Sequence, residues 1–272
     1  MKRLLCAAGL GLAAPLASAS AFLDQFDTLD GAFWYVADGW HNGPPFNVGW
    51  RADHAQAGGG QLVLGIDATS CPAGCSGLPY ASANVASNAV YGYGSVRGRL
   101  QAAAGAGLVT SLFTYVGPDS GHAHDEIDIE ILGQDTTRVQ FNFFAAGSTG
   151  NEYVVDLGFD ASAAMHDYAF AWSPTGIAWY VDGVLRHTVS AASVTLPSIP
   201  GQVMVNLWAV DGSATAWAGT YDGTPALARY DYVGFTPLAA VRETGVLALL
   251  VLGLPLVLGC SLRGRGQNGR AG

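Results

Sequence analysis

The segment HAHDEIDIEILG at residues 122–133 constrains the fold of this chain more than any other. Successive side chains of an extended strand point to opposite faces, so Ile127, Ile129 and Ile131 would share one face. The opposite face would carry, in order, His122, His124, Glu126, Asp128, Glu130 and Leu132. The pattern predicts a strand whose isoleucines pack into a core while its carboxylates stand in a column on the other side.

The rest of the chain also favours strands. Short β-branched and aromatic runs are separated by Gly, Pro, Asn and Asp, and helical periodicity over ten or more residues is hard to find. The predicted strands are 61–66, 89–102, 108–117, 126–132, 138–144, 167–173, 176–189, 202–210 and 230–235. Asp182-Gly183 is a two-residue hairpin signal inside 176–189. The predicted fold class is therefore an all-β sandwich.

At least two of these runs have one aliphatic face and one face that mixes amides with aromatic side chains, and a third carries Ser and aromatic residues opposite Thr110, Leu112 and Thr114. The mixed faces carry Gln202, Met204, Asn206 and Trp208 in one run, Arg138, Gln140, Asn142 and Phe144 in another, and Ser111, Phe113 and Tyr115 in the third. A solvated face would carry Lys, Glu and Thr. Aromatic rings stack on pyranose rings and amides bond their hydroxyls, so the pattern indicates a sugar-binding groove. The alternative is an ordinary core with stray polar groups.

The acidic column is costly in a chain of which charged residues are only 12%. At ~3.3 Å per residue, carboxylates two positions apart have Cα atoms about 6–7 Å from each other, and like charges this close should raise one pKa. Paired carboxylates of unequal pKa are typical of glycoside hydrolysis, and side chains leaning together from i and i+4 could reach the roughly 5–5.5 Å that retention requires. The alternatives are a Ca²⁺ site, a solvated surface strand, or a sugar-binding protein without catalysis.

Both ends of the chain have the composition of targeting segments. Residues 1–21 have Lys2 and Arg3, an apolar stretch, and small residues before Ala19 and Ala21, which predicts a cleaved secretory signal rather than a membrane anchor. Residues 244–262 carry no charge and precede three arginines, so 242–272 is predicted to be a membrane or sorting tail. This tail resembles PEP-CTERM sorting signals; a plain C-terminal anchor is the alternative.

Residues 22–241 remain for one domain, which we expect to be a monomer in contact with the membrane only through the tail. They contain six Arg, no Lys, and 20 acidic residues, the chain's 21 less Glu243, which leaves a net charge near −14. This charge argues against nucleic acids and anionic membranes and suits a neutral polysaccharide. In an exported protein, Cys71 and Cys75 of CPAGC are predicted to form a disulfide; two free thiols are the alternative.

The motif DEIDIEILG at 125–133 resembles the signature of glycoside hydrolase family 16. Other segments, from ADGWHNGPPFNVGWRA at 37–52 to VNLWAVDG at 205–212, follow in the order found in bacterial lichenases, the endo-β-1,3-1,4-glucanases of that family. The resemblance covers about 25–236. It implies a curved β-jelly-roll of two antiparallel sheets with a concave substrate groove. It also implies a retaining endo-β-glucanase that hydrolyses β-1,4 bonds in mixed-linkage β-glucan.

The resemblance also implies roles for individual residues. Glu126 would be the nucleophile, Glu130 the general acid/base, and Asp128 a supporting carboxylate that bonds the nucleophile. Substrate-binding residues would be Trp40, Asn42, Phe46, Phe113, Tyr115, Asn142, Asn206, Trp208 and Trp217, with His124 beside them on the acidic face. Catalysis would need no cofactor, and a structural Ca²⁺ would be held by the carbonyl of Gly60 and by Asp231.

Several departures leave the linkage open. His124 stands where lichenases have Trp; plant xyloglucan-modifying members of the family have His at this position, as here. Asn84 and Ala86 replace a Glu and an Arg that contact sugar, while Val48 and Ser82 replace a disulfide. The alternatives are hydrolysis or transglycosylation of xyloglucan, β-1,3-glucan or a bacterial exopolysaccharide, or a non-catalytic glycan-binding surface protein. The regular Glu-x-Asp-x-Glu spacing lacks the extra residue of laminarinases and favours the lichenase and xyloglucan branch.

Overall fold

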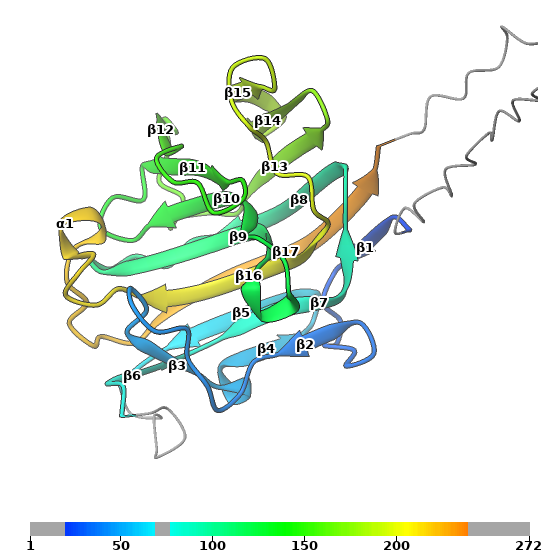
Figure 1. The fold of residues 1–272 in the computed structure, drawn as a ribbon. Helices are drawn as coiled ribbons and strands as arrows, with labels where there is room; N and C mark the ends of the chain where they lie inside the picture. The colour runs from blue at the N-terminus through cyan, green and yellow to red at the C-terminus, as the bar shows by residue number, and fades with distance from the viewer. Residues whose placement is uncertain (1–19, 69–76, 239–272) are drawn as a thin grey trace, which may run out of the picture. The chain divides into compact units, whose positions relative to one another are not determined.

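A computed structural model describes residues 20–68 and 77–238 of the 272-residue chain (Figure 1). The predicted tail at 242–272, residues 1–19 of the predicted signal, and the pair Cys71 and Cys75 lie outside the described residues. Within the described ranges, no helix is both long and apolar enough to cross a bilayer.

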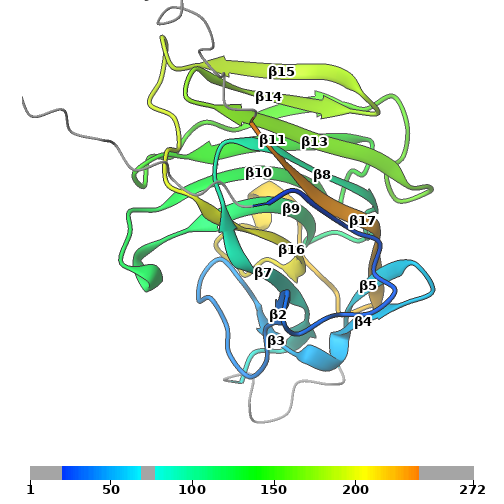
Figure 2. The same cartoon turned by 90° about the vertical axis from the view of Figure 1, so that its right-hand side faces the viewer.

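Two large antiparallel sheets form the structure (Figures 1 and 2). The first has the order β15 (Val184–Ser190), β14 (Gly176–Val181), β13 (His166–Ser173), β8 (Gly94–Gln101), β17 (Ala226–Pro237), β5 (Gln61–Ile66) and β4 (Ala55–Gly58), with β1 (Phe22–Asp24) paired to β17. The second has the order β12 (Tyr153–Asp156), β11 (Arg138–Phe144), β10 (Asp125–Leu132), β9 (Leu108–Val116), β16 (Gly201–Ala209), β7 (Asn84–Tyr91) and β2 (Trp34–Val36). The predicted all-β jelly-roll is confirmed.

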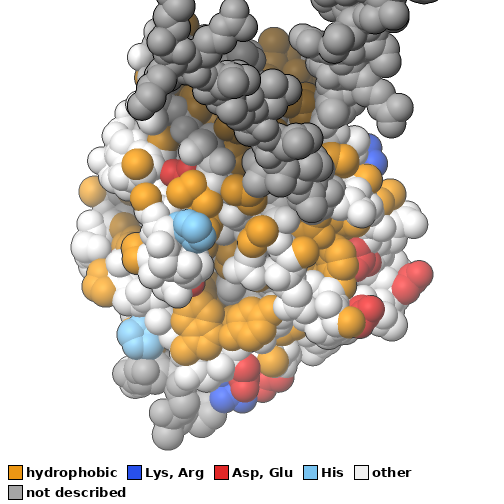
Figure 3. All heavy atoms as spheres, turned by 45° about the vertical axis from the view of Figure 1, so that its right-hand side comes forward, with side chains coloured by type: hydrophobic (Ala, Val, Ile, Leu, Met, Phe, Trp, Pro, Cys, Tyr) orange, Lys and Arg blue, Asp and Glu red, His pale blue; other side chains and the backbone are white. Residues whose placement is uncertain are grey.

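The remaining elements are small. β3 (Val48–Trp50) and β6 (Tyr80–Ser82) form a short parallel pair. The described helices are η1 (Ala52–His54), η3 (Pro118–Ser120) and the four-residue α1 (Thr215–Ala218). Uncharged side chains make up most of the face shown in Figure 3, as the low content of charged residues leads one to expect.

The core faces of the strands are those that the alternation predicts. Ile127, Ile129 and Ile131 of β10 are at most 1% exposed, and Trp179 of β14 donates its indole N–H to the carbonyl of Asp128 at 3.1 Å. This bond joins the two sheets behind the acidic column. The apolar faces of β11 and β16 belong to the same buried cluster, so one apolar core packs against the back of the predicted strand that carries the carboxylates.

One predicted strand is wrong. The run 89–102 is divided between β7, which ends at Tyr91, and β8, which begins at Gly94, and the two lie in different sheets. A Cβ on Gly94 would lie 2.5 Å from the carbonyl oxygen of Thr236, so only glycine permits β17 to approach here. The predicted Asp182-Gly183 hairpin is confirmed, with φ of 49° and 74° at its two central residues, as a type I′ turn requires.

Candidate active site

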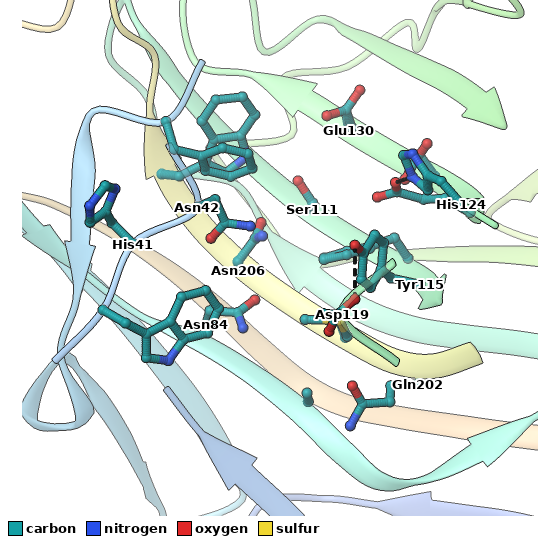
Figure 4. Close-up of a pocket in the computed structure, with 18 of the residues that line it drawn as sticks. His41, Asn42, Asn84, Ser111, Tyr115, Asp119, His124, Glu130, Gln202 and Asn206 are labelled. Carbon is teal, nitrogen blue, oxygen red and sulfur yellow. Dashed lines mark hydrogen bonds and ion pairs between the residues drawn. The ribbon is translucent and has the colours of Figure 1, made fainter. Parts of the chain in front are cut away.

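A groove of about 790 Å³ lies over the sheet that contains β10 (Figure 4). It is lined from β2, β7, β9, β10 and β16, and from the loop around residues 40–46. The lining residues are Tyr35, Trp40, His41, Asn42, Pro44, Phe46, Asn84, Ala86, Ser111, Phe113, Tyr115, Asp119, His124, Glu126, Asp128, Glu130, Gln202, Met204, Asn206 and Trp208. None of these lining residues is Lys or Arg, so the described wall offers a substrate no positive charge except from histidine.

Strand register arranges the groove in rows. Each carboxylate of β10 lies opposite a residue of β9, which lies opposite a residue of β16. The rows are Glu126, Tyr115 and Gln202; Asp128, Phe113 and Met204; and Glu130, Ser111 and Asn206. Ala86 and Tyr35 continue the second row. Asn84 continues the third row, whose members are labelled in Figure 4. The mixed polar and aromatic faces predicted for separate strands therefore form one continuous surface.

Eight of the ten predicted substrate-binding residues line this groove, and two do not. Asn142 lies opposite Asp128 in β11, but it is only 6% exposed, and its side-chain oxygen accepts the N–H of Phe143. Trp217 belongs to the segment of α1, where it lies 5.9 Å from Trp208 and donates its indole N–H to Gln140 at 3.0 Å. Asn142 thus continues the row of Asp128 into β11, and Trp217 lies beside Trp208, so both residues border the groove.

The aromatic side chains of the loop are held in place by neighbours. Phe46 stacks on Trp208 with ring centroids 4.1 Å apart. The indole N–H of Trp40 bonds the hydroxyl of Tyr35 at 2.9 Å, and the side-chain oxygen of Asn42 accepts from Trp50 at 2.6 Å. These contacts preorganise a wall of flat rings over the sheet, which suits stacking against sugar rings.

Asp128 lies between the two glutamates on the same face. It is 4% exposed, and its Oδ2 is buried with no hydrogen-bond donor among the described residues. Burial, followed by the negative charges of Glu126 and Glu130, raises the pKa of Asp128 well above its usual range, and its hydrogen bond with Glu126 adds to this. A neutral Asp128 can donate this hydrogen bond to the Glu126 carboxylate.

Glu130 is also perturbed toward its neutral form. Burial, followed by the charge of Glu126, raises the pKa of Glu130 to about 8. Gln140 acts in the opposite direction, because its side-chain amide donates to Oε2 of Glu130 at 2.9 Å. At neutral pH this glutamate therefore holds a proton that it can give to a substrate oxygen.

Two positioning contacts went unrecognised in the sequence. The sequence places Gln140 on a polar face but does not show its partner, since pairing across strands depends on register. Asp125 lies on the core side of β10, 5% exposed, and accepts N–H bonds from Ala146, Ser198 and Ile199 at 2.7–3.0 Å. The available signal was its place among core-facing isoleucines, because a buried carboxylate needs donors.

The predicted calcium position lies away from the groove. Gly60 directly precedes β5, and the register between β17 and β5 places Asp231 beside this end of the strand. The carboxylate of Asp231 also faces the guanidinium of Arg99 at 3.7 Å. One carboxylate and one carbonyl are oxygen ligands of the right kind, but Ca²⁺ takes six to eight. The described residues contain no cluster of three or more His, Cys, Asp or Glu that could hold a metal, so other carbonyls and water would have to complete the shell.

Comparisons with known proteins agree with this geometry. Residues 42–233 match the family model of the glycosyl hydrolases family 16. A beta-glucanase of Paenibacillus macerans is 43% identical over 219 residues, which are 80% of this chain and 88% of that protein. A beta-glucanase of Bacillus subtilis (strain 168) is 43% identical over 237 residues, which are 84% and 93% of the two chains.

Solved structures give the same result. A prokaryotic beta-1,3-1,4-glucanase (lichenase) derived from a mouse hindgut metagenome is similar with a TM-score of 0.77 and 42% identity, covering 81% of this chain and 100% of its own. The beta-glucanase of Bacillus licheniformis has a TM-score of 0.74 and 40% identity, with coverage of 81% and 99%. With most of its length matched by the family model and by these relatives, the chain belongs to the glycosyl hydrolases of family 16.

Proposed function

We propose that this glycoside hydrolase is a retaining endo-β-glucanase that cleaves β-1,4 bonds in mixed-linkage β-1,3-1,4-glucan. The observation that carries the proposal is the column of Glu126, Asp128 and Glu130 inside a groove lined by aromatic rings and amides. The relatives named beta-glucanase and lichenase support the choice of substrate. The lack of Lys and Arg among the described lining residues suits an uncharged polymer.

The proposed reaction is a double displacement. The carboxylate of Glu126 attacks the anomeric carbon while protonated Glu130 gives its proton to the glycosidic oxygen, so the leaving sugar departs with a hydroxyl. Glu130, now ionised, takes a proton from water, whose oxygen attacks the same carbon and releases Glu126. Two inversions give net retention. Neutral Asp128 would restrain Glu126 by a hydrogen bond and withdraw some of its charge between the two steps.

The terminal segments support a proposal about location. The signal pattern in 1–21 and the apolar, arginine-flanked tail in 242–272 fit an exported protein that is secreted or retained at the cell envelope. We propose that the enzyme is a monomer and meets the membrane only through this tail. Fractionation of cells expressing the full chain, with and without 242–272, tests this: loss of the tail should move the protein from the envelope to the medium.

Activity and stereochemistry test the main proposal together. Full-length wild type and Glu126→Ala are incubated with barley β-glucan, lichenan, laminarin and xyloglucan, with Asp27→Ala, an exposed site outside the groove, as control. Barley β-glucan and lichenan should be cut by wild type and control, with a loss of several orders of magnitude in Glu126→Ala. NMR should show the β-anomer in the first product. An α-anomer first, or equal rates with and without Glu126, would refute the mechanism.

A second candidate is cleavage or transfer on another polysaccharide, such as xyloglucan, β-1,3-glucan or a bacterial exopolysaccharide. The observation that favours it is the groove wall at His124 and Ala86, where the lichenase side chains are replaced. Product sizes with added oligosaccharide acceptors separate the reactions, because transfer lengthens products whereas hydrolysis only shortens them. A chain that binds glucan but cleaves none of the four polymers would instead be a binding protein.

A further inference from the structure

His124 contacts the carboxylate that we propose as the nucleophile. His124 directly precedes β10 in the sequence, two residues before Glu126. Its Nε2 lies in hydrogen-bond contact with Oε2 of Glu126. Both side chains are partly shielded, with 29% of His124 and 17% of Glu126 exposed. Figure 4 shows the imidazole inside the groove, near Tyr115.

The chemistry of the two groups fixes the direction of this bond. An ionised carboxylate has only acceptors, so Nε2 of His124 must carry the hydrogen, in either the neutral Nε2–H tautomer or the imidazolium. The proton is assigned from this pairing. Glu126 therefore receives a hydrogen bond from His124 on one side, while Asp128 bonds it from the next position of the column.

The imidazole is itself held in a narrow slot. Its ring stacks on Phe144 at 4.4 Å with an interplanar angle of 14°, and it meets Tyr115 at 5.3 Å and 60°. Both partners lie opposite Glu126 in the register, Phe144 on β11 and Tyr115 on β9. The backbone is anchored too, since the carbonyl of His124 accepts the N–H of Gly147 at 2.8 Å. Rings on both sides thus aim Nε2 at the carboxylate.

We propose that His124 is a positioning residue that holds the Glu126 carboxylate in its attacking orientation. This inference rests on the proposed role of Glu126 as nucleophile. A freely rotating glutamate would spend part of its time in rotamers that cannot reach the anomeric carbon, and small misplacements of a reacting group cost up to roughly a hundredfold in rate. The effect should appear in the chemical step and leave substrate binding almost unchanged.

Two substitutions separate the hydrogen bond from the ring stack. His124→Gln keeps an N–H donor that can reach Glu126 but loses the ring, whereas His124→Phe keeps a ring against Phe144 but has no donor. The matched control is His122→Gln, an exposed histidine two residues earlier that lies outside the groove. We expect kcat to fall roughly 10- to 100-fold in His124→Phe, with KM within about twofold, and to recover most of this in His124→Gln.

The opposite pattern would overturn the inference. If His124→Phe keeps wild-type kcat, or if KM rises while kcat stays, His124 is a sugar contact and does not position Glu126. A His124→Gln enzyme as impaired as His124→Phe would also contradict it, because the donor would then be irrelevant. Circular dichroism spectra and melting curves of all variants should match wild type, which shows that each one folds.

An NMR experiment tests the contact without using activity. In ¹⁵N-histidine-labelled protein, the His124 signals are assigned by their loss in His124→Gln, and their shifts should identify hydrogen on Nε2. They should move in Glu126→Gln, while those of His122 should not. Unchanged His124 signals would refute the contact. If wild type cleaves no glucan, the proposed function fails, but this measurement still decides whether His124 bonds Glu126.

Discussion

The side-chain amide nitrogen of Gln140 lies 2.9 Å from Oε2 of Glu130 and donates a hydrogen bond to it. The other end of this amide accepts the indole N–H of Trp217 at 3.0 Å. An indole nitrogen can only donate, so the acceptor on Gln140 must be its oxygen, and the orientation of the amide is fixed. A proton on Glu130 is consequently directed to Oε1, which is free of this bond.

Replacing Gln140 should shift the pH dependence of catalysis. The bond from Gln140 lowers the pKa of Glu130, which burial and the charge of Glu126 raise to about 8. In Gln140→Leu the pKa of Glu130 should rise further, and the alkaline limb of the kcat/KM profile should move to higher pH, since the acid stays protonated longer. Gln56→Leu, an exposed change in the other sheet, is the control. Superimposable alkaline limbs in all three proteins would contradict this.

Removing the charge of Glu130 should stabilise the fold in a defined pH window. The folded pKa of about 8 exceeds the ordinary value of 4.5, so between these values the folded chain holds a proton that the unfolded chain releases. Stability should therefore fall as pH rises across this window. Glu130→Gln has no such proton, so its Tm advantage over wild type should be absent at pH 4 and grow toward pH 8. For a domain of this size, each kcal/mol of added unfolding free energy raises Tm by about 2–4 °C. An equal difference in Tm at pH 4 and pH 8 would show that Glu130 is not neutral when folded.

Asp128 should act as a neutral donor, and a matched pair of variants can show it. Burial, followed by the charges of Glu126 and Glu130, raises the pKa of Asp128 well above its usual range, which favours a proton that Asp128 can direct toward Glu126. Asp128→Asn retains a donor of nearly the same shape, whereas Asp128→Ala removes it. We expect Asp128→Asn to keep kcat within about tenfold of wild type and Asp128→Ala to lose roughly a hundredfold or more. Equal losses in the two variants would mean that the negative charge of Asp128, and not its proton, is needed.

Calcium should raise the thermal stability of the chain if the predicted site at Gly60 and Asp231 binds it. A ligand that binds only the folded state adds RT ln(1 + [L]/Kd) to the free energy of unfolding. Melting curves in millimolar Ca²⁺ and in EDTA should differ for wild type and coincide for Asp231→Asn. The loss of the contact with Arg99 in this variant should matter little, because both side chains are exposed. Identical wild-type melting curves in Ca²⁺ and EDTA would show that the folded protein does not bind calcium.

Local properties of the strands are predictable from the sequence, whereas contacts between distant segments are not. The faces of β9, β10, β11 and β16 were predictable because side-chain alternation is a local property of an extended chain. The single strand predicted at 89–102 is wrong because its two halves pair with different distant strands, β7 with β16 and β8 with β17, and alternation along the chain does not show such partners. Asn142 lies on the predicted face beside Asp128, but its side-chain oxygen accepts the N–H of Phe143, a contact that alternation does not give.

The sequence by itself determined that Glu126, Asp128 and Glu130 stand in a column opposite three isoleucines, since the period of a strand is two in any fold. Only the tertiary structure decided what touches them. Register between β10 and β11 brings Gln140 to Glu130 and Phe144 to His124, and packing of separate segments brings Trp217 to Gln140. Register and packing depend on the whole sheet and its loops, so the proton on Glu130 and the restraint on Glu126 are properties of the folded chain.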